Sequence, residues 1–237
     1  MKAIVKFIRN IILLGIFVGL LGGFYLYKRG EALYEKTIAE KPLKVAVSEV
    51  MASDQYIPYE QISPYFVDAL VSIEDRRFFE RLGVDYYSIV RALIANLNSQ
   101  KIVEGGSTIT QQLAKNMYFT HEALIDRKVA EIFFVRDLEN SYSKEEIFAL
   151  YASVIYYGDG YYGVKKASLG YYGKAASELD LYQSSLLAGL PQAPSIYQLS
   201  TGLSKAKERQ KLVLKAMVAN KCISEEEMNA VLNEFRE

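Results

Sequence analysis

Hydrophobic positions are most concentrated in one run near the start of the chain. Residues 11–27 carry no charge, and Phe7 and Ile8 extend the apolar stretch toward the N-terminus. At a helical rise of about 1.5 Å per residue, this run is long enough to cross a bilayer. A cleaved secretory signal is the alternative, but the following segment YKRGEALYEK lacks a small-x-small cleavage site, which favours an uncleaved anchor.

The charges that flank this run predict its orientation. Basic residues precede it, whereas those that follow it are accompanied by glutamates: Lys2, Lys6 and Arg9 before, and Lys28, Arg29, Glu31 and Glu35 after. Positive charge tends to stay on the cytoplasmic side, so the bias favours a cytoplasmic N-terminus. We therefore expect a single-pass protein of the cytoplasmic membrane with the rest of the chain outside.

The chain after the anchor divides into a short polar segment and a longer periodic body. Residues 28–60 mix charges with a β-prone run at 44–50 and the breakers Pro42 and Pro58, which is typical of a stalk or a small extended segment. Further on, apolar residues recur at three- and four-residue spacing, at Phe66, Ala69, Leu70 and Ile73 and again at Ile89, Leu93, Ala95 and Leu97. The pattern predicts a mostly α protein, with residues 1–30 as cytoplasmic tip and transmembrane anchor, 31–57 as stalk or linker, and 58–237 as the folded domain.

Several helix starts are also legible. The spacing of Thr108 with Gln111 and of Ser143 with Glu146 predicts capping boxes, and Asp126 or Ser177 is a candidate cap for the helix after it. Two further helices are expected at 204–220 and 224–235. We identify no chemistry in these two and expect them to close the core.

Composition narrows the classes of function. Lys and Arg together number 28, as do Asp and Glu, so the charge balance gives no reason to expect nucleic acid as a partner. The chain has one cysteine, Cys222, and one histidine, His121, which excludes an internal disulfide framework and a Cys/His zinc cluster.

A first chemical candidate lies in the segment SIEDRRFFERLGVD. Glu74 and Asp75 end an apolar helical stretch, and the phenylalanines at 78–79 supply a hydrophobic wall beside them. A carboxylate in such surroundings has a raised proton affinity, which suits a general base. The alternative is a solvated salt-bridge cluster with the arginines at 76–77.

The second candidate, EGGSTITQQLAKN, is more specific. Two glycines lead into a hydroxyl-rich helix start, where free backbone N–H groups and the helix dipole favour an anion. The face formed by Thr108, Gln111, Gln112 and Lys115 suits a pyrophosphate bound through Lys115. The alternative is a capped helix with a polar exposed side.

The third candidate is the segment DRKVAE. Arg127 and Glu131 lie four residues apart, hence on one helix face, while Ala130 and the residues at 132–134 make the other side apolar. An exposed ion pair is the alternative, although the favourable helical order would place the glutamate before the basic residue.

These three segments, in this order, resemble the first three motifs of the family 51 glycosyltransferases. That family comprises the peptidoglycan polymerase domains of monofunctional transglycosylases and bifunctional penicillin-binding proteins. A fourth block, SKEEIFALYASVIYYGDGYYGVKKASLGYYGK, and a fifth, LLAGLPQAPSIY, resemble the family as well. The likeness covers roughly residues 58–197.

The resemblance implies a lysozyme-like helical glycosyltransferase domain with a long cleft, a hydrophobic lower lobe resting in the membrane, and lipid II as substrate. It makes Glu74 the catalytic base, Glu131 the second essential glutamate, and Lys115 and Arg127 the pyrophosphate-binding cations. Further substrate-binding positions would be Ser107, Thr108, Gln111, Gln112 and Asn116 in the second motif, together with Arg76 and Lys128.

The resemblance also implies the reaction and its partners. Lipid II would be polymerised into β-1,4-linked glycan strands, with release of undecaprenyl pyrophosphate. The expected partners are lipid II, the growing glycan chain and the cytoplasmic membrane, with other cell-wall synthesis proteins as further candidates and no nucleic acid. We expect no obligate cofactor; a divalent cation, Mg or Mn, is compatible with a pyrophosphate leaving group, but no ligand cluster demands one.

Some positions depart from the family pattern without replacing the glutamates or the cations. The family usually has a histidine at the position of Arg81 and Leu-Asn at the positions of Ala152 and Ser153. It usually has a glutamate at the position of Gln183 and an alanine at that of Ser185. These departures keep open a weak or inactive lipid II-binding scaffold of the same fold. A lysozyme-like glycan-cleaving enzyme is a second alternative, but a neutral glycan has no pyrophosphate for the second motif to hold.

The sequence also lacks a Ser-x-x-Lys motif accompanied by the downstream motifs of a transpeptidase. We therefore expect either a monofunctional enzyme or a piece of a longer bifunctional protein.

Overall fold

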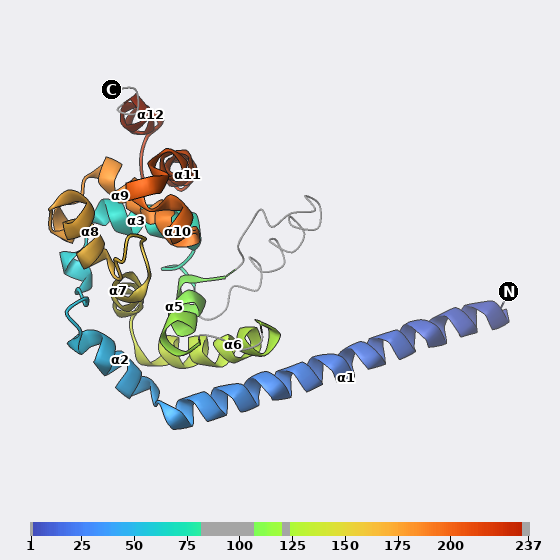
Figure 1. The fold of residues 1–237 in the computed structure, drawn as a ribbon. Coiled ribbons are helices and arrows are strands. Elements are labelled where there is room, and N and C mark those ends of the chain that lie inside the picture. The colour runs from blue at the N-terminus through green and yellow to red at the C-terminus, as the bar shows by residue number, and fades with distance from the viewer. Residues whose placement is uncertain (1, 82–106, 120–123, 234–237) are drawn as a thin grey trace.

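The computed structural model describes residues 2–81, 107–119 and 124–233, and this part of the chain is helical (Figure 1). In these ranges the extended structure is limited to an isolated antiparallel bridge between Tyr156 and Tyr162. The elements in chain order are α1 (Lys2–Glu40), α2 (Leu43–Ala52), η1 (Tyr59–Gln61), α3 (Pro64–Glu74), α5 (Ile109–Tyr118), α6 (Leu124–Ser141), α7 (Lys144–Val154), α8 (Val164–Tyr172), η2 (Ala176–Glu178), α9 (Leu181–Gly189), η3 (Leu190–Gln192), α10 (Pro194–Tyr197), α11 (Leu199–Ala219) and α12 (Glu225–Asn233). The prediction of a mostly α protein is confirmed. The apolar pattern at 89–97, the glycines at 105–106 and His121 lie outside the described residues.

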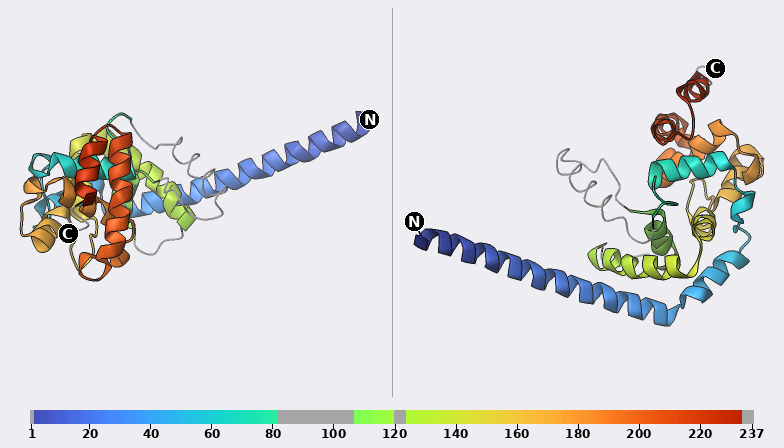
Figure 2. Two further views of the ribbon diagram at one scale, coloured as in Figure 1. Left: turned by 90° about the horizontal axis from the view of Figure 1, so that it is seen from above. Right: turned by 180° about the vertical axis from the view of Figure 1, so that it is seen from behind.

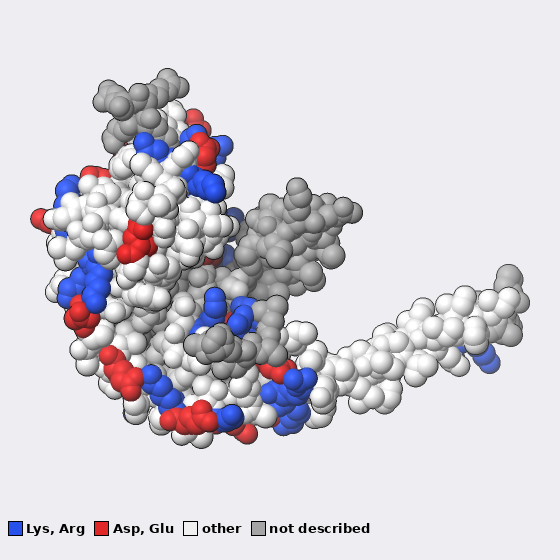
Figure 3. Space-filling view, in the orientation of Figure 1, with Lys and Arg blue, Asp and Glu red and all other residues white. Residues whose placement is uncertain are grey.

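Helix α1 is one continuous helix that projects far beyond the body of the protein (Figures 1 and 2). The large apolar side chains from Phe7 to Tyr25 are each more than half exposed. Figure 3 shows this outer half as nearly free of charge. The helix is long and apolar enough to cross a membrane, and a hydrocarbon environment removes the cost of so much exposed apolar surface.

Of the two alternatives for residues 28–60, the small extended segment is contradicted, because residues 31–40 continue α1 and residues 43–52 form α2. The assignment of residues 31–57 as a stalk or linker stays a prediction. Pro42 marks the break between the two helices, at the N-cap of α2. Ala46 and Val47, in the run that looked β-prone, are buried where α2 packs against α7. A preference for strand is weak and depends on packing, so burial of one helical face decides the structure here.

The lower layer of the body consists of α6 lying along the C-terminal half of α1, with α5 and α7 above it (Figure 1). The two long helices approach closely at Gly30 of α1. A Cβ atom at this position would lie only 2.3 Å from Cβ of Val129 in α6, so only glycine fits there. Tyr34 packs against the rings of Phe133 and Phe134, at centroid distances of 5.3 and 4.9 Å. The C-terminal half of α1 therefore packs closely against α6.

The upper layer is formed by α3, α9 and α11, which pack on one another around fully buried side chains. The apolar pattern predicted for α3 is confirmed, since Phe66, Ala69 and Leu70 have no exposed surface. Helices α11 and α12 confirm the two C-terminal helices that the sequence predicts.

Both predicted capping boxes are present. The side chain of Thr108 accepts from the Gln111 N–H at the start of α5, and that of Ser143 accepts from the Glu146 N–H at the start of α7. The two other predicted caps are wrong. Asp126 lies inside the first turn of α6, where it pairs with Arg29 at 2.5 Å. Ser177 lies within η2, and α9 is instead capped by Asp180, three residues further along.

Candidate active site

Glu74 is the last residue of α3, where the chain leaves the upper layer. Its side chain is 14% exposed and meets groups from two other helices. Gln112 of α5 donates from Nε2 to Glu74 Oε2 at 2.7 Å. On the other oxygen, Arg209 of α11 brings a guanidinium nitrogen to 3.8 Å from Glu74 Oε1. The carboxylate is thus held at a junction of three helices.

The amide of Gln112 has a defined orientation. The hydroxyl of Tyr151, a fully buried side chain of α7, donates to Gln112 Oε1 at 3.0 Å. The amide nitrogen is therefore left to face Glu74, and a donor there stabilises the ionised form of the carboxylate. This chain of hydrogen bonds connects the core of α7 to the candidate base.

Burial raises the pKa of Glu74 above its ordinary value, and the negative charge of Asp75 adds to that shift. The hydrogen bond from Gln112 and the charge of Arg209 oppose it. A carboxylate whose proton affinity is raised toward neutral pH is a better general base than a solvated glutamate. The environment of Glu74 therefore suits proton abstraction.

Asp75, unlike Glu74, bonds to the backbone at the start of α5. Its Oδ2 accepts from the backbone N–H of Ile109 at 3.1 Å, at the first turn of α5, and also from Arg81. Its side chain is 4% exposed. Asp75 therefore connects the end of α3 to the start of α5. The alternative of a solvated salt-bridge cluster is contradicted, because both carboxylates are largely enclosed, with Asp75 paired to Arg81 and Glu74 beside Arg209.

A second charged cluster lies on α6. Glu131 has no exposed surface, its Oε2 accepts from Lys128 Nζ at 2.7 Å, and its Oε1 lies 3.4 Å from Arg127 Nε. Lys128 also donates to the hydroxyl of Ser107 at 2.9 Å. The alternative of an exposed ion pair is contradicted, since the glutamate is buried. The cluster joins α6 to the residue just before the cap of α5.

The other predicted site residues divide into two groups. Thr108 and Gln111 are buried and bond to each other in the capping box, so their side chains stabilise the helix start. Lys115, Asn116 and Arg76 are exposed. Asn116 donates to the carbonyl of Gln112 at 2.9 Å, and no ion pair engages the ammonium of Lys115 within the described ranges. Helix α5 therefore presents Lys115 at the surface, unpaired with any described residue, while Gln112 of the same helix faces Glu74.

The sequence predicted no chemistry in the C-terminal helices, but the structure brings Arg209 of α11 beside the candidate base. Arg209 follows Ala206 by three residues and precedes Val213 by four, on the face of α11 that is buried. A charged residue on an otherwise buried helix face is a signal that the sequence offered. Tyr151, within the fourth motif, was likewise not predicted to contact the site.

Three of the departures from the family pattern, Ser153, Gln183 and Ser185, make local hydrogen bonds. The hydroxyl of Ser153 accepts from the Ile57 N–H at 3.2 Å and donates to the Ala149 carbonyl at 2.7 Å. Gln183 lies in the capping box of α9. Ser185 bonds to the carbonyl of Leu181, on the same helix, at 2.7 Å. These substitutions adjust packing around the site and do not contact Glu74.

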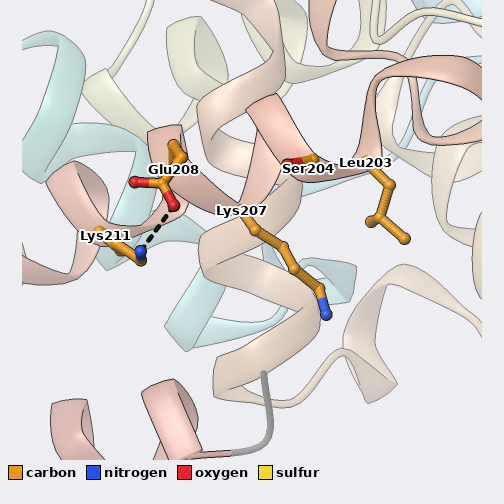
Figure 4. Close-up of a pocket in the computed structure, with 5 residues that line it drawn as sticks. All are labelled: Leu203, Ser204, Lys207, Glu208 and Lys211. Carbon is orange, nitrogen blue, oxygen red and sulfur yellow. Dashed lines mark hydrogen bonds and ion pairs between the residues drawn. The ribbon is translucent and has the colours of Figure 1, made fainter. Parts of the chain in front are cut away.

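A surface depression on α11 does not belong to this site. It is lined by Leu203, Ser204, Lys207, Glu208 and Lys211, and Figure 4 shows Glu208 paired with Lys211 at 2.6 Å. All five residues come from one helix, so the depression brings no distant groups together. No group of three or more His, Cys, Asp or Glu side chains suitable for a metal occurs among the residues that the structure describes.

Comparisons with known proteins find relatives of this chain among the penicillin-binding proteins. Penicillin-binding protein 1A of Aquifex aeolicus (strain VF5) is 40% identical over 178 residues, or 75% of this chain and 24% of that protein. Penicillin-binding protein 2D of Bacillus subtilis (strain 168) is 40% identical over 179 residues, which cover 76% of this chain and 26% of that protein. Penicillin-binding protein 1A of Haemophilus influenzae is 34% identical over 238 residues, which cover 98% of this chain and 27% of that protein. A crystal structure of the Haemophilus influenzae protein aligns with 41% of this chain and 14% of that one, at 41% identity and a TM-score of 0.38. The chain thus spans about a quarter of the length of these relatives. A family model described as transglycosylase matches residues 41–218, three quarters of the chain, and the protein belongs to that family.

Proposed function

We propose that the protein is a peptidoglycan glycosyltransferase that polymerises lipid II into β-1,4-linked glycan strands and releases undecaprenyl pyrophosphate. The observation that carries the proposal is the enclosed carboxylate of Glu74, with one oxygen held by Gln112 and the pKa raised by burial. Membership of the transglycosylase family supports the reaction class.

In the proposed mechanism the base acts on the acceptor. Glu74 takes the proton from the 4-hydroxyl of the GlcNAc of an acceptor lipid II. The oxygen attacks C1 of the MurNAc at the reducing end of the growing chain, and the bond from C1 to the pyrophosphate oxygen breaks. Attack opposite the leaving group inverts the configuration at C1, so the enzyme is an inverting hexosyltransferase.

The leaving pyrophosphate develops negative charge, which the cations of α5 and α6 would neutralise. Lys115 is exposed and without an ion pair among the described residues, so it is available to a ligand. Arg127 is 17% exposed and anchored by Glu131, which fixes its position without removing it from solvent. Fixed charges of this kind stabilise a transition state because they need not reorganise during the reaction. Lys128, held between Glu131 and Ser107, would place the start of α5 beside the same ligand.

We propose that these cations replace an obligate cofactor. Treatment with EDTA should leave most of the polymerisation, and readdition of Mg or Mn should change the rate only modestly. Complete loss on chelation, with recovery on readdition, would contradict this part of the proposal.

The proposal places the protein in the cytoplasmic membrane by a single span, with the catalytic domain outside. The exposed apolar half of α1 supports the anchor, and the flanking charges support the orientation. Protease added to intact spheroplasts should digest the catalytic domain. Protection until the membrane is disrupted would show that the orientation is wrong.

The decisive experiment is incubation of the purified full-length protein with lipid II, followed by sizing of the products on a gel. The wild type should give long glycan strands, and Glu74→Gln should give none while retaining its circular dichroism spectrum. Glu60→Gln, an exposed glutamate on η1, is the matched control and should behave as wild type. Binding of lipid II without polymer by the wild type would identify a non-catalytic scaffold, and cleavage of preformed glycan would identify a hydrolase.

A further inference from the structure

Glu74 has two oxygens in different surroundings. Oε2 accepts the hydrogen bond from Gln112 at 2.7 Å, whereas Oε1 has the guanidinium of Arg209 at 3.8 Å. A separation of 3.8 Å is too long for a hydrogen bond but short enough for strong attraction between opposite charges. Oε1 is therefore the oxygen that remains open to a proton from the substrate.

Arg209 reaches this position by crossing a neighbouring helix at a glycine. A Cβ atom at Gly189, the last residue of α9, would lie 2.9 Å from Cγ of Arg209. The side chain of Arg209 is 12% exposed, and its Nε has no hydrogen-bond partner among the described residues. A buried guanidinium left without a full set of partners is costly unless a nearby negative charge compensates it. Glu74 supplies that charge.

The other groups that face Glu74 do not duplicate the effect of Arg209. From α3 itself, the adjoining Asp75 is negative and opposes ionisation of Glu74. Gln112 of α5 is neutral, and the hydroxyl of Tyr151 on α7 has a pKa raised well above its ordinary value by burial, so it stays neutral as well. Helix α9, which packs against α3, contains no charged residue. Arg209 is thus the cation that acts on Glu74 within the described part of the chain.

We propose that Arg209 is a positioning residue that keeps Glu74 in its carboxylate form and directs Oε1 toward the acceptor hydroxyl. The inference rests on the proposed function. In the reaction, the proton of the acceptor hydroxyl moves to Oε1, the new C1–O bond forms, and the electron pair of the broken C1–O bond leaves with the pyrophosphate. Arg209 keeps its own proton throughout, and its charge favours the return of Glu74 to the carboxylate for the next cycle.

The test compares Arg209→Gln with Arg209→Lys in the full-length protein in detergent. An opposite charge within about 4–6 Å typically moves a carboxyl pKa by about 1–3 units, so Arg209→Gln should move the acid limb of the polymerisation rate upward by about one pH unit. Arg209→Lys retains the charge and should restore much of the wild-type profile. Lys211→Gln, which changes a partly exposed lysine of the same helix, is the control and should leave the profile unchanged.

A second readout does not depend on activity. In protein with 13C-labelled glutamate carboxyl groups, the signal of Glu74 is identified by its absence from Glu74→Gln, and its titration midpoint is then followed by NMR. The midpoint should rise in Arg209→Gln and return in Arg209→Lys. Gly189→Ala, which displaces the stem of Arg209 without removing its charge, should give a smaller rise, and it serves if Arg209→Gln does not fold.

The outcomes separate the two proposals. An unchanged midpoint in Arg209→Gln, or in Gly189→Ala where that variant is the one that folds, overturns the role of Arg209. Equal losses of rate in the glutamine and lysine variants, with lower melting temperatures and no change in the pH profile, would show a purely structural role and also overturn it. A wild type without polymer overturns the proposed function, while the NMR midpoint still decides whether Arg209 controls Glu74.

Discussion

Lys115 and Arg127 were assigned the same role from the sequence, but the structure predicts that removing them has different consequences. Lys115 is exposed and makes no ion pair within the described residues, so Lys115→Ala should change the free energy of unfolding by less than about 0.5 kcal/mol. Its effect should fall on catalysis. A charge-assisted contact made mainly in the transition state contributes about 3 kcal/mol, which corresponds to a loss of roughly a hundredfold in turnover.

Arg127→Ala should reduce both rate and stability. Its Nε lies 3.4 Å from Oε1 of Glu131, which has no exposed surface, so truncation leaves that oxygen without its neighbouring charge. That oxygen accepts no hydrogen bond from the described residues, so what is lost is the positive charge beside a buried carboxylate. Breaking a buried ion pair costs about 3–5 kcal/mol, and Lys128 at 2.7 Å from the other oxygen reduces the cost to about 2 kcal/mol. For a chain of this size, about 2 kcal/mol corresponds to a fall in melting temperature of roughly 4–8 °C.

The assay measures the initial rate of lipid II polymerisation and thermal unfolding on the same preparations. Lys36→Ala, which removes an exposed cation of α1, is the control and should leave both quantities unchanged. Wild-type rates in both Lys115→Ala and Arg127→Ala would remove the pyrophosphate role from the mechanism. An unchanged melting temperature in Arg127→Ala would show that its pairing with Glu131 contributes nothing to stability.

Three further predictions concern stability and packing. Burial raises the pKa of Glu74, so the favourable contribution of this residue to folding is present below its ordinary pKa of 4.5 and is lost as the pH rises through its pKa in the folded protein. Glu74→Gln should therefore melt at a higher temperature than wild type at neutral pH, and a difference in melting temperature that does not shrink toward pH 4.5 would contradict this. Tyr151→Phe removes the hydroxyl that orients Gln112, so it should lower the free energy of unfolding by about 1 kcal/mol and slow polymerisation several-fold. An unchanged polymerisation rate would show that Gln112 keeps its orientation without this hydrogen bond. Gly30→Leu forces a side chain into Val129 and should cost about 1–3 kcal/mol in thermal unfolding while the protein still sediments with the membrane; an unchanged melting temperature would show that the close approach of α1 to α6 is not needed.

The features that the sequence determined are those whose causes lie within a few residues. The charge-free run at 11–27 forms the exposed apolar half of α1, because length and hydropathy alone mark a helix that can cross a membrane. The capping boxes begun by Thr108 and Ser143 form as predicted, because each joins a side chain to a backbone group three residues away. The motifs of the sequence resemble those of the family 51 glycosyltransferases, and the family match agrees with that resemblance.

The prediction for residues 44–50 failed because local preference competed with tertiary burial. The run contains β-branched residues, but in α2 it buries Ala46 and Val47, and α2 packs against α7. The same reason applies to Asp126, whose neighbours suggested a cap. The partner that decides its role is Arg29, on a helix that only the fold brings beside it.

Only the tertiary structure decided how the candidate base is surrounded. Glu74, Gln112, Tyr151 and Arg209 come from four helices, and no spacing along the chain relates them. The sequence supplied the carboxylate, but its proton affinity depends on burial and on charges brought close by packing. Electrostatic energy depends on distance through space and on the surrounding dielectric, which are set when α3, α5, α7 and α11 pack together and not by the order of residues in the chain.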